Sequence, residues 1–205
     1  MRSSKKIVGY MVLAISFYAT NIQAEEAPLY IGVNYGSSDM DSGRSGLTGT
    51  AMLDEKDSGF KIYTGYSIND TVSIEGHYLN FGEVSLKGNQ GDQFTYKRTV
   101  RTMNGNNYNN VSEAKSFGVS GVVKLPVSDI LSPFIKVGLQ KWDVDTTINS
   151  LNGGVSLNKD GTDIFYGVGV GVSVNKSLSI RGEFERFDID GRDTDYLSFG
   201  LAYKI

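Results

Sequence analysis

Cysteine is absent from this chain of 205 residues, and histidine occurs once, as His77. Without cysteine the chain has no disulfide framework and no thiolate metal site. A single histidine cannot supply the pair of imidazoles that zinc or haem sites commonly use. We therefore expect no cofactor and no bound metal.

The chain also has no apolar run long enough for a transmembrane helix. Its most apolar stretch, residues 7–19, is short and is broken by glycine, tyrosine and serine. Three basic residues precede it (Arg2, Lys5 and Lys6), and the small residue Ala24 closes the region. This order is typical of a cleaved secretory signal at residues 1–24, which predicts a mature domain at residues 25–205. The alternative is an amphipathic first helix of a cytosolic domain.

The charge balance excludes one class of partner. The formal net charge is −3, and removal of the three basic residues of the signal would change it to −6. A mildly acidic domain offers no electrostatic footprint for nucleic acid.

Glycine and alternating apolar residues dominate what remains, with 25 glycines against 3 prolines. Apolar residues recur at every second position, which is the period of a β-strand with one apolar face. We predict eight strands, at residues 29–36, 60–68, 72–78, 116–125, 134–140, 164–173, 178–185 and 197–205.

The connections between these strands alternate in length. Long stretches near residues 38–58, 83–111 and 144–161 and an intermediate one at 188–194 alternate with short turns at 69–70, 126–132 and 175–176. An even number of strands with short turns at one end and longer loops at the other is typical of outer-membrane barrels. We expect the termini on the periplasmic side and four loops outside.

Strand parity by itself is compatible with a soluble barrel, whose apolar face would point inward. Three features favour a membrane barrel instead. The signal exports the chain, and the polar face is rich in the glycine and serine that fit a narrow interior. The apolar face carries aromatics near the strand ends, as an interfacial girdle does: Tyr35, Phe60, Tyr66, Tyr78, Phe117, Phe184 and Tyr203.

Several segments resemble the membrane domain of the OmpA family. They are Lys136–Leu139 with the following Lys141-Trp142-Asp143, and the stretches 161–170, 181–187 and 197–204. The resemblance implies an all-β fold, an eight-stranded antiparallel transmembrane β-barrel, in the outer membrane of a Gram-negative bacterium. It also implies contact with outer-membrane lipid and lipopolysaccharide, and assembly by the barrel-assembly machinery.

The chain departs from that family in two respects. Its last residue, Ile205, is not the terminal aromatic usual in this class. No segment resembling the peptidoglycan-binding domain follows the eighth strand, so we expect a stand-alone barrel.

Charged residues on the polar faces form a candidate site. Parity points eight of them into the lumen: Lys61, Glu75, Lys124, Lys136, Arg181, Glu183, Glu185 and Lys204. Four of these, Glu75, Lys124, Lys136 and Glu183, fall where the resemblance implies an interior ionic cluster. We hypothesise that the two glutamates share the two lysines and close the barrel to ions.

Three other groups of residues could carry a function, and each also has a simpler structural interpretation. A lipid-modifying barrel would need His77 beside a serine and an acid near its substrate, whereas parity turns His77 into the lumen, so we expect no catalytic residue and no enzyme. The acidic residues of the first loop lack the spacing of a calcium loop. In the second loop, Lys97, Arg98 and Arg101 either touch lipopolysaccharide phosphates or belong to a flexible polar loop.

Two functions remain open. The first is a structural, envelope-integrity or surface-interaction role through the four extracellular loops, with an unidentified ligand. The alternative is a small channel or ligand-carrying barrel. Eight strands enclose an interior that side chains fill, which favours the first.

Overall fold

The structure is a computed structural model that describes residues 29–125, 127–150 and 153–205. All regular elements in these ranges are β-strands, and they include no helix long and apolar enough to cross a bilayer. The predicted signal at residues 1–24 lies outside the described residues.

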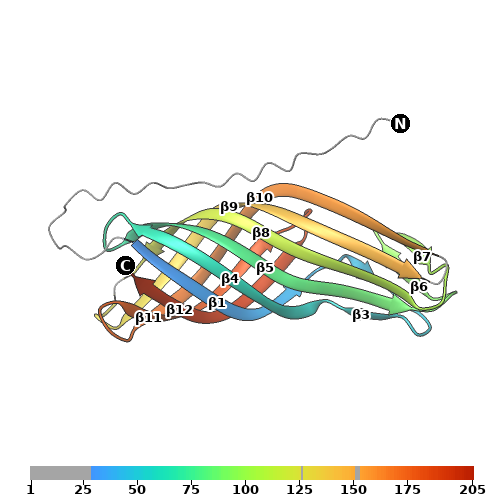
Figure 1. The fold of residues 1–205 in the computed structure, drawn as a ribbon, viewed down its shortest axis with the longest axis horizontal. Helices are drawn as coiled ribbons and strands as arrows, with labels where there is room; N and C mark the ends of the chain where they lie inside the picture. The colour runs from blue at the N-terminus through green and yellow to red at the C-terminus, as the bar shows by residue number, and fades with distance from the viewer. Residues whose placement is uncertain (1–28, 126, 151–152) are drawn as a thin grey trace.

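Eight long strands close into one antiparallel barrel (Figure 1), as the sequence predicts. Each pairs with its neighbour along the chain, and the last pairs with the first, where Val33 faces Leu201. The strands are β1 (Leu29–Met40), β4 (Lys56–Ser67), β5 (Val72–Gly88), β8 (Tyr108–Lys124), β9 (Leu131–Ser150), β10 (Gly153–Ser173), β11 (Leu178–Asp188) and β12 (Asp193–Lys204).

The two ends of the barrel differ. We call the end with the β4–β5, β8–β9 and β10–β11 turns the turn end. Two of its turns begin at an asparagine whose side chain accepts backbone N–H bonds, as Asn69 does from Thr71 and Val72 (2.9 and 2.8 Å). Asn175 does the same for the β10–β11 turn.

The opposite end, the loop end, carries additional short strands. β2 (Arg44–Ser45), β6 (Gln93–Tyr96) and β7 (Thr99–Thr102) form a separate small sheet, and β3 (Met52–Asp54) pairs with β5. Figure 1 shows these elements beside the extended ends of β5, β8, β9 and β10. The first two long connections are therefore structured by strand pairing.

The prediction of a loop at residues 144–161 is wrong. β9 continues to Ser150 and pairs with β10 from Gly153, so this stretch is the outer part of a β-hairpin. Similarly, β5 and β8 pair as far as Gly88 and Tyr108, inside the segment expected as the second loop. Apolar residues are fewer in these extensions and lie among glycines and polar residues, so the hydropathy alternation is weaker although the backbones pair.

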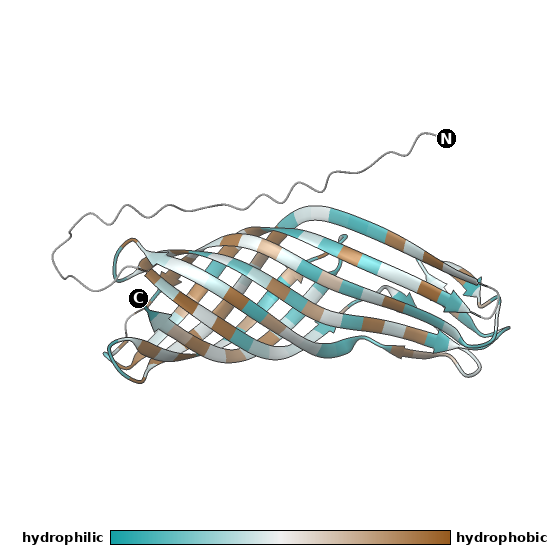
Figure 2. Ribbon diagram, in the orientation of Figure 1, coloured by the Kyte–Doolittle hydropathy of each residue, from teal (hydrophilic) through white to brown (hydrophobic). Residues whose placement is uncertain are grey.

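The barrel wall is apolar outside and polar inside. On β1, Val33 is 52% and Tyr35 66% exposed on the outer face, whereas the intervening Asn34 is 3% exposed. The predicted aromatic residues all face outward, with Tyr78 half-buried among its neighbours. Figure 2 shows apolar residues recurring along the strands on the turn-end half, while the extended ends are more polar. This pattern fits a barrel whose turn-end half is surrounded by lipid.

Side chains fill the lumen in layers. Near the turn end lie Tyr30 and Tyr63, whose rings pass so close to Gly65 and Gly32 that no side chain fits at either position. A charged layer follows. Above it, towards the loop end, comes an apolar layer built around Leu79, Phe81, Trp142, Phe165, Phe187 and Tyr196.

Candidate functional site

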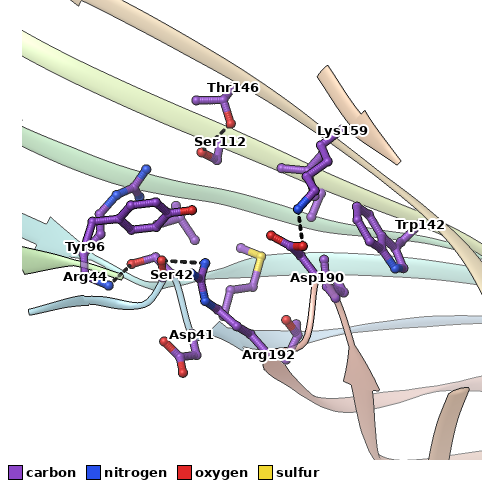
Figure 3. Close-up of a pocket in the computed structure, with 16 residues that line it drawn as sticks. Asp41, Ser42, Arg44, Tyr96, Ser112, Trp142, Thr146, Lys159, Asp190 and Arg192 are labelled. Carbon is purple, nitrogen blue, oxygen red and sulfur yellow. Dashed lines mark hydrogen bonds and ion pairs between the residues drawn. The ribbon is translucent and has the colours of Figure 1, made fainter. Parts of the chain in front are cut away.

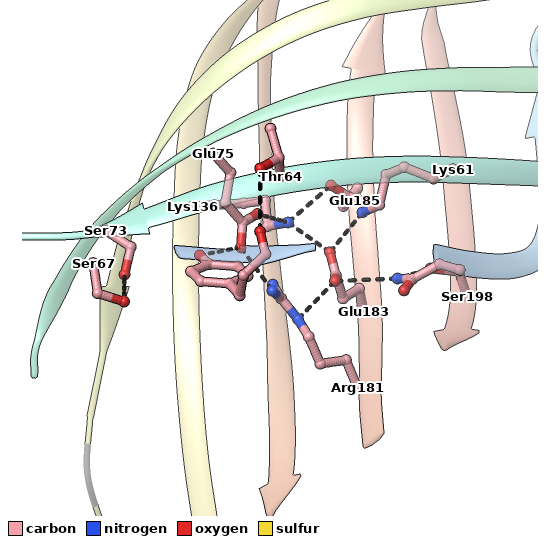
Figure 4. A network of polar contacts seen from close by, with 12 residues as sticks. Lys61, Thr64, Ser67, Ser73, Glu75, Lys136, Arg181, Glu183, Glu185 and Ser198 are labelled. Atoms are coloured by element: carbon pink, nitrogen blue, oxygen red, sulfur yellow. Dashed lines mark hydrogen bonds and ion pairs between the residues drawn. The ribbon is translucent and has the colours of Figure 1, made fainter. Parts of the chain in front are cut away.

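The charged layer is a network of six side chains from four strands. Lys61 of β4, Glu75 of β5, Lys136 of β9, and Arg181, Glu183 and Glu185 of β11 converge on the barrel axis (Figure 4). Alternation of side chains along each strand turns all six inward. Each side chain is at most 6% exposed, and three positive charges balance three negative ones.

Lys136 is the centre of the network. Its Nζ lies 2.6 Å from Glu183, 3.1 Å from Glu75 and 3.3 Å from Glu185. One ammonium group thus joins carboxylates from β5 and β11 across the lumen.

The other two cations, Arg181 and Lys61, pair with the same three carboxylates. Arg181 contacts Glu75 through Nη1 at 2.6 Å and Glu183 through Nε at 3.0 Å. Lys61 contacts Glu183 at 2.7 Å and also forms an ion pair with Glu185. Every carboxylate therefore meets two or three cations, which is the compensation that buried charges require.

Neutral groups hold the carboxylates in position. Tyr30 donates its hydroxyl to Glu75 at 2.7 Å, and Asn34 donates its amide to Glu183 at 3.1 Å. The guanidinium of Arg181 lies 4.7 Å from the ring of Tyr63 and 4.4 Å from the ring of Phe134, within cation–π range. The network is therefore fixed from several strands at once.

Three of the four residues named from the sequence meet here: Glu75, Lys136 and Glu183. The fourth, Lys124, lies nearer the turn end with its ammonium 4.9 Å above the ring of Tyr30, and it has no ion pair with a carboxylate of the described residues. Its expected place as a shared cation is taken by Arg181.

Sequence reasoning omitted Lys61, Arg181 and Glu185 from the cluster, although parity had turned them inward. Which of the inward charges meet depends on their level along the barrel axis. That level follows from the register between neighbouring strands, which the sequence alone did not provide. Strand pairing sets Gly167 opposite both Lys136 and Glu185, which brings these two side chains to one level. Lys204, also expected inside, is exposed where β12 ends.

His77 lies inside the barrel above the network. Its ring packs edge-on against Phe165 at a centroid distance of 4.9 Å and against Phe187 at 5.9 Å. Its Nε2 lies 3.4 Å from the hydroxyl of Ser116, at the limit of a weak hydrogen bond. The residue therefore contributes to the apolar layer.

The closed apolar-outside barrel with a buried ionic interior defines a transmembrane β-barrel of the outer-membrane class. Over residues 10–204 the chain matches the family described as the outer membrane protein beta-barrel domain, and it belongs to that family. It is an OmpA-like barrel of the outer membrane of Gram-negative bacteria. Among curated proteins, none matches its sequence.

Solved structures share the fold at low sequence identity. Neisserial surface protein A superposes with a TM-score of 0.56 at 12% identity, covering 87% of this chain and 97% of that one. Ail, the attachment invasion locus protein of Yersinia pestis, gives 0.52 at 14%, covering 85% and 97%. The N-terminal barrel of Pseudomonas aeruginosa OprF gives 0.51 at 10%, covering 87% and 98%.

Proposed function

We propose that this protein is a non-conducting barrel that acts at the cell surface through its loop end, without catalysis. The observation that carries the proposal is the filled lumen. The neutral ionic network lies beneath an apolar layer in which Phe165 and Phe187 stack at 4.9 Å. An ion entering the lumen would have to displace both layers.

The alternative, a small channel, would require the network to open. Each cation would then lose its carboxylates inside a narrow lumen, which is costly without water to replace them. The purified protein in planar bilayers tests this directly. We expect no discrete conductance steps from the native barrel, and reproducible unitary currents would overturn the non-conducting assignment.

The loop end offers an unusual surface for interaction. β10 pairs with β11 only from Phe165 to Ser173, while its residues 153–164 pair with β9 alone. Their outer backbone groups form a strand edge of the kind to which an extended segment of another protein can add. Val155 and Leu157 on this segment are 51% and 56% exposed.

The structural relatives support a surface role. Ail was crystallised in complex with the heparin analogue sucrose octasulfate, and the Neisserial relative is described as a surface protein. We infer that the loop end of the present chain likewise faces outward, with the turn end in the periplasm.

Lipid contacts follow from this orientation. The outward-facing cations Lys115, Lys141 and Arg186 each contact a carboxylate on the barrel wall, and Lys141 lies directly across from Phe117. Arg98 is exposed in the β6–β7 turn. We propose lipopolysaccharide as the surrounding lipid and the barrel-assembly machinery as the partner that inserts the chain.

A hairpin replacement tests the surface role. Exchange of residues 145–158 for a two-residue Asn-Gly turn removes residues 153–158, the outer half of the free strand edge, and leaves the rest of the barrel wall intact. Cells that carry the native protein should adhere to host-cell or glycan surfaces better than cells with the shortened hairpin. Equal adherence at equal surface amounts, across a panel of such surfaces, would contradict a role for this edge.

A further inference from the structure

A cavity of about 160 Å³ opens at the loop end, above the apolar layer. Its floor is apolar and includes Met40, Trp142 and Ile189, while Arg44, Lys159 and Arg192 lie around it (Figure 3). The lining comes from β1, β2, β5, β6, β8, β9 and β10 and from residues 189–194, so strands far apart in the sequence build one cavity at the mouth of the barrel.

Two guanidinium groups in this cavity are held by neutral partners. Arg44 donates through Nη2 to the side-chain oxygen of Asn110 at 3.1 Å. Arg192 donates through Nη1 to the backbone oxygen of Ser42 at 2.8 Å, and its guanidinium lies 5.1 Å from the ring of Tyr96. Within the described part of the chain, neither arginine has an ion pair with a carboxylate, in contrast to the arginines of the barrel wall.

The carboxylates nearby are already engaged. Asp41 accepts from the backbone N–H of Gly43 at 2.6 Å, and Glu55 accepts from the backbone N–H of Ser42 at 2.7 Å. Asp190 forms an ion pair with Lys159. The two arginines consequently retain positive charge that these acids do not neutralise by direct contact.

Burial works against that charge. Desolvation, which is the largest cause, and the like charge of Arg192 both lower the pKa of Arg44. A bound anion would compensate both guanidinium groups and relieve their mutual repulsion.

We propose that the mouth cavity binds a compact oxyanion, a phosphate or sulfate group carried by a sugar, between Arg44 and Arg192. The guanidinium fork matches the oxygens of such groups. With about 30 Å³ for each water, the cavity holds such a group with a few adjoining atoms, and its apolar floor suits an uncharged ring. This site does not depend on whether the barrel conducts, so the two proposals fail separately.

Titration calorimetry on the full-length protein in zwitterionic detergent tests the site. The probes are glucose 6-phosphate and glucose 6-sulfate, with inorganic phosphate, inorganic sulfate and neutral glucose beside them at constant ionic strength. We expect saturable binding of at least one ester, at least tenfold tighter than that of glucose. The preferred ester shows whether the natural ligand carries a phosphate or a sulfate group. No saturable binding of either ester, or equal affinity for glucose, would overturn the proposal.

Matched arginine variants locate the site. R44Q and R192Q should each weaken binding at least tenfold, whereas R98Q, which alters an exposed arginine of the same loop end, should leave it unchanged. Heat-modifiable gel migration verifies that each variant is folded, and either pocket variant alone suffices if the other fails to fold. An equal loss in R98Q would show diffuse surface attraction, and unchanged affinity in the folded pocket variants would place binding elsewhere.

Discussion

Lys136→Met should destabilise the barrel by about 3–5 kcal/mol, the usual penalty for stranding a buried charge. Methionine keeps an unbranched apolar stem but removes the ammonium that contacts Glu183 at 2.6 Å and Glu75 at 3.1 Å. The network then holds two cations and three carboxylates. Glu183→Gln should cost a similar amount, because it leaves three cations with two carboxylates.

The double variant Lys136→Met/Glu183→Gln restores neutrality. It leaves the ion pair between Lys61 and Glu185 and the pair between Arg181 and Glu75, the latter at 2.6 Å. Because two complete pairs survive, the double variant should cost less than the sum of the single variants by at least about 1 kcal/mol, as coupled neighbours do.

Reversible urea unfolding in lipid vesicles, followed by tryptophan fluorescence, measures these free energies. Trp142 is the only tryptophan and lies in the apolar layer, on the loop-end side of the network. Lys141→Met is the matched control, because this neighbouring lysine faces outward at 68% exposure and pairs with Asp160 at 3.6 Å. It should cost at most about 1 kcal/mol. Additive single-variant effects, or a Lys136→Met effect no larger than the control, would refute the shared network.

Three further outcomes follow from the fold. The protein should extract with outer membranes and migrate differently on gels when unheated, and recovery as a detergent-free periplasmic monomer would contradict a membrane barrel. Because the chain has no native cysteine, a single cysteine at Asn106 should react with an impermeant reagent on whole cells and one at Asp70 should not; the reverse would invert the orientation. Gly65→Val should destabilise by about 1–3 kcal/mol in the same unfolding assay, because a Cβ there lies 2.1 Å from the ring of Tyr30, whereas Gly121→Val, with nothing within 4 Å, should be tolerated.

The barrel itself was predictable because the side chains that face lipid are apolar. Every second residue of a membrane strand must be apolar, so the faces of all eight long strands could be assigned from parity. Beyond the part of the barrel that faces lipid, this constraint no longer applies. Residues 143–150 and 153–160 pair as strands although they contain few apolar residues among glycine and polar ones, so hydropathy did not distinguish them from a loop.

The charged layer was predictable in part for a related reason. Parity identifies which side chains enter the lumen, but their axial level follows from strand register, which alternation within one strand does not fix. Lys124 and Lys136 look equivalent by parity, yet only Lys136 lies at the level of Glu183. The mouth cavity was out of reach, since Arg44 and Arg192 lie in segments without periodicity and meet only through the closed barrel.

The two sets of cations differ in a way that matches the two proposals, a sealed lumen and an anion site at the loop end. Inside the barrel, Lys61, Lys136 and Arg181 are matched by an equal number of carboxylates, which is the compensation that buried charges require. At the mouth, Arg44 and Arg192 are held by neutral groups beside a cavity open to water, where exchangeable anions can compensate them. A charge-balanced interior stabilises one fixed structure, whereas an unbalanced, partly hydrated pair leaves binding energy for a ligand. The apolar layer that includes Trp142 and Phe165 lies between them, and on these two proposals it would separate an anion at the mouth from the network.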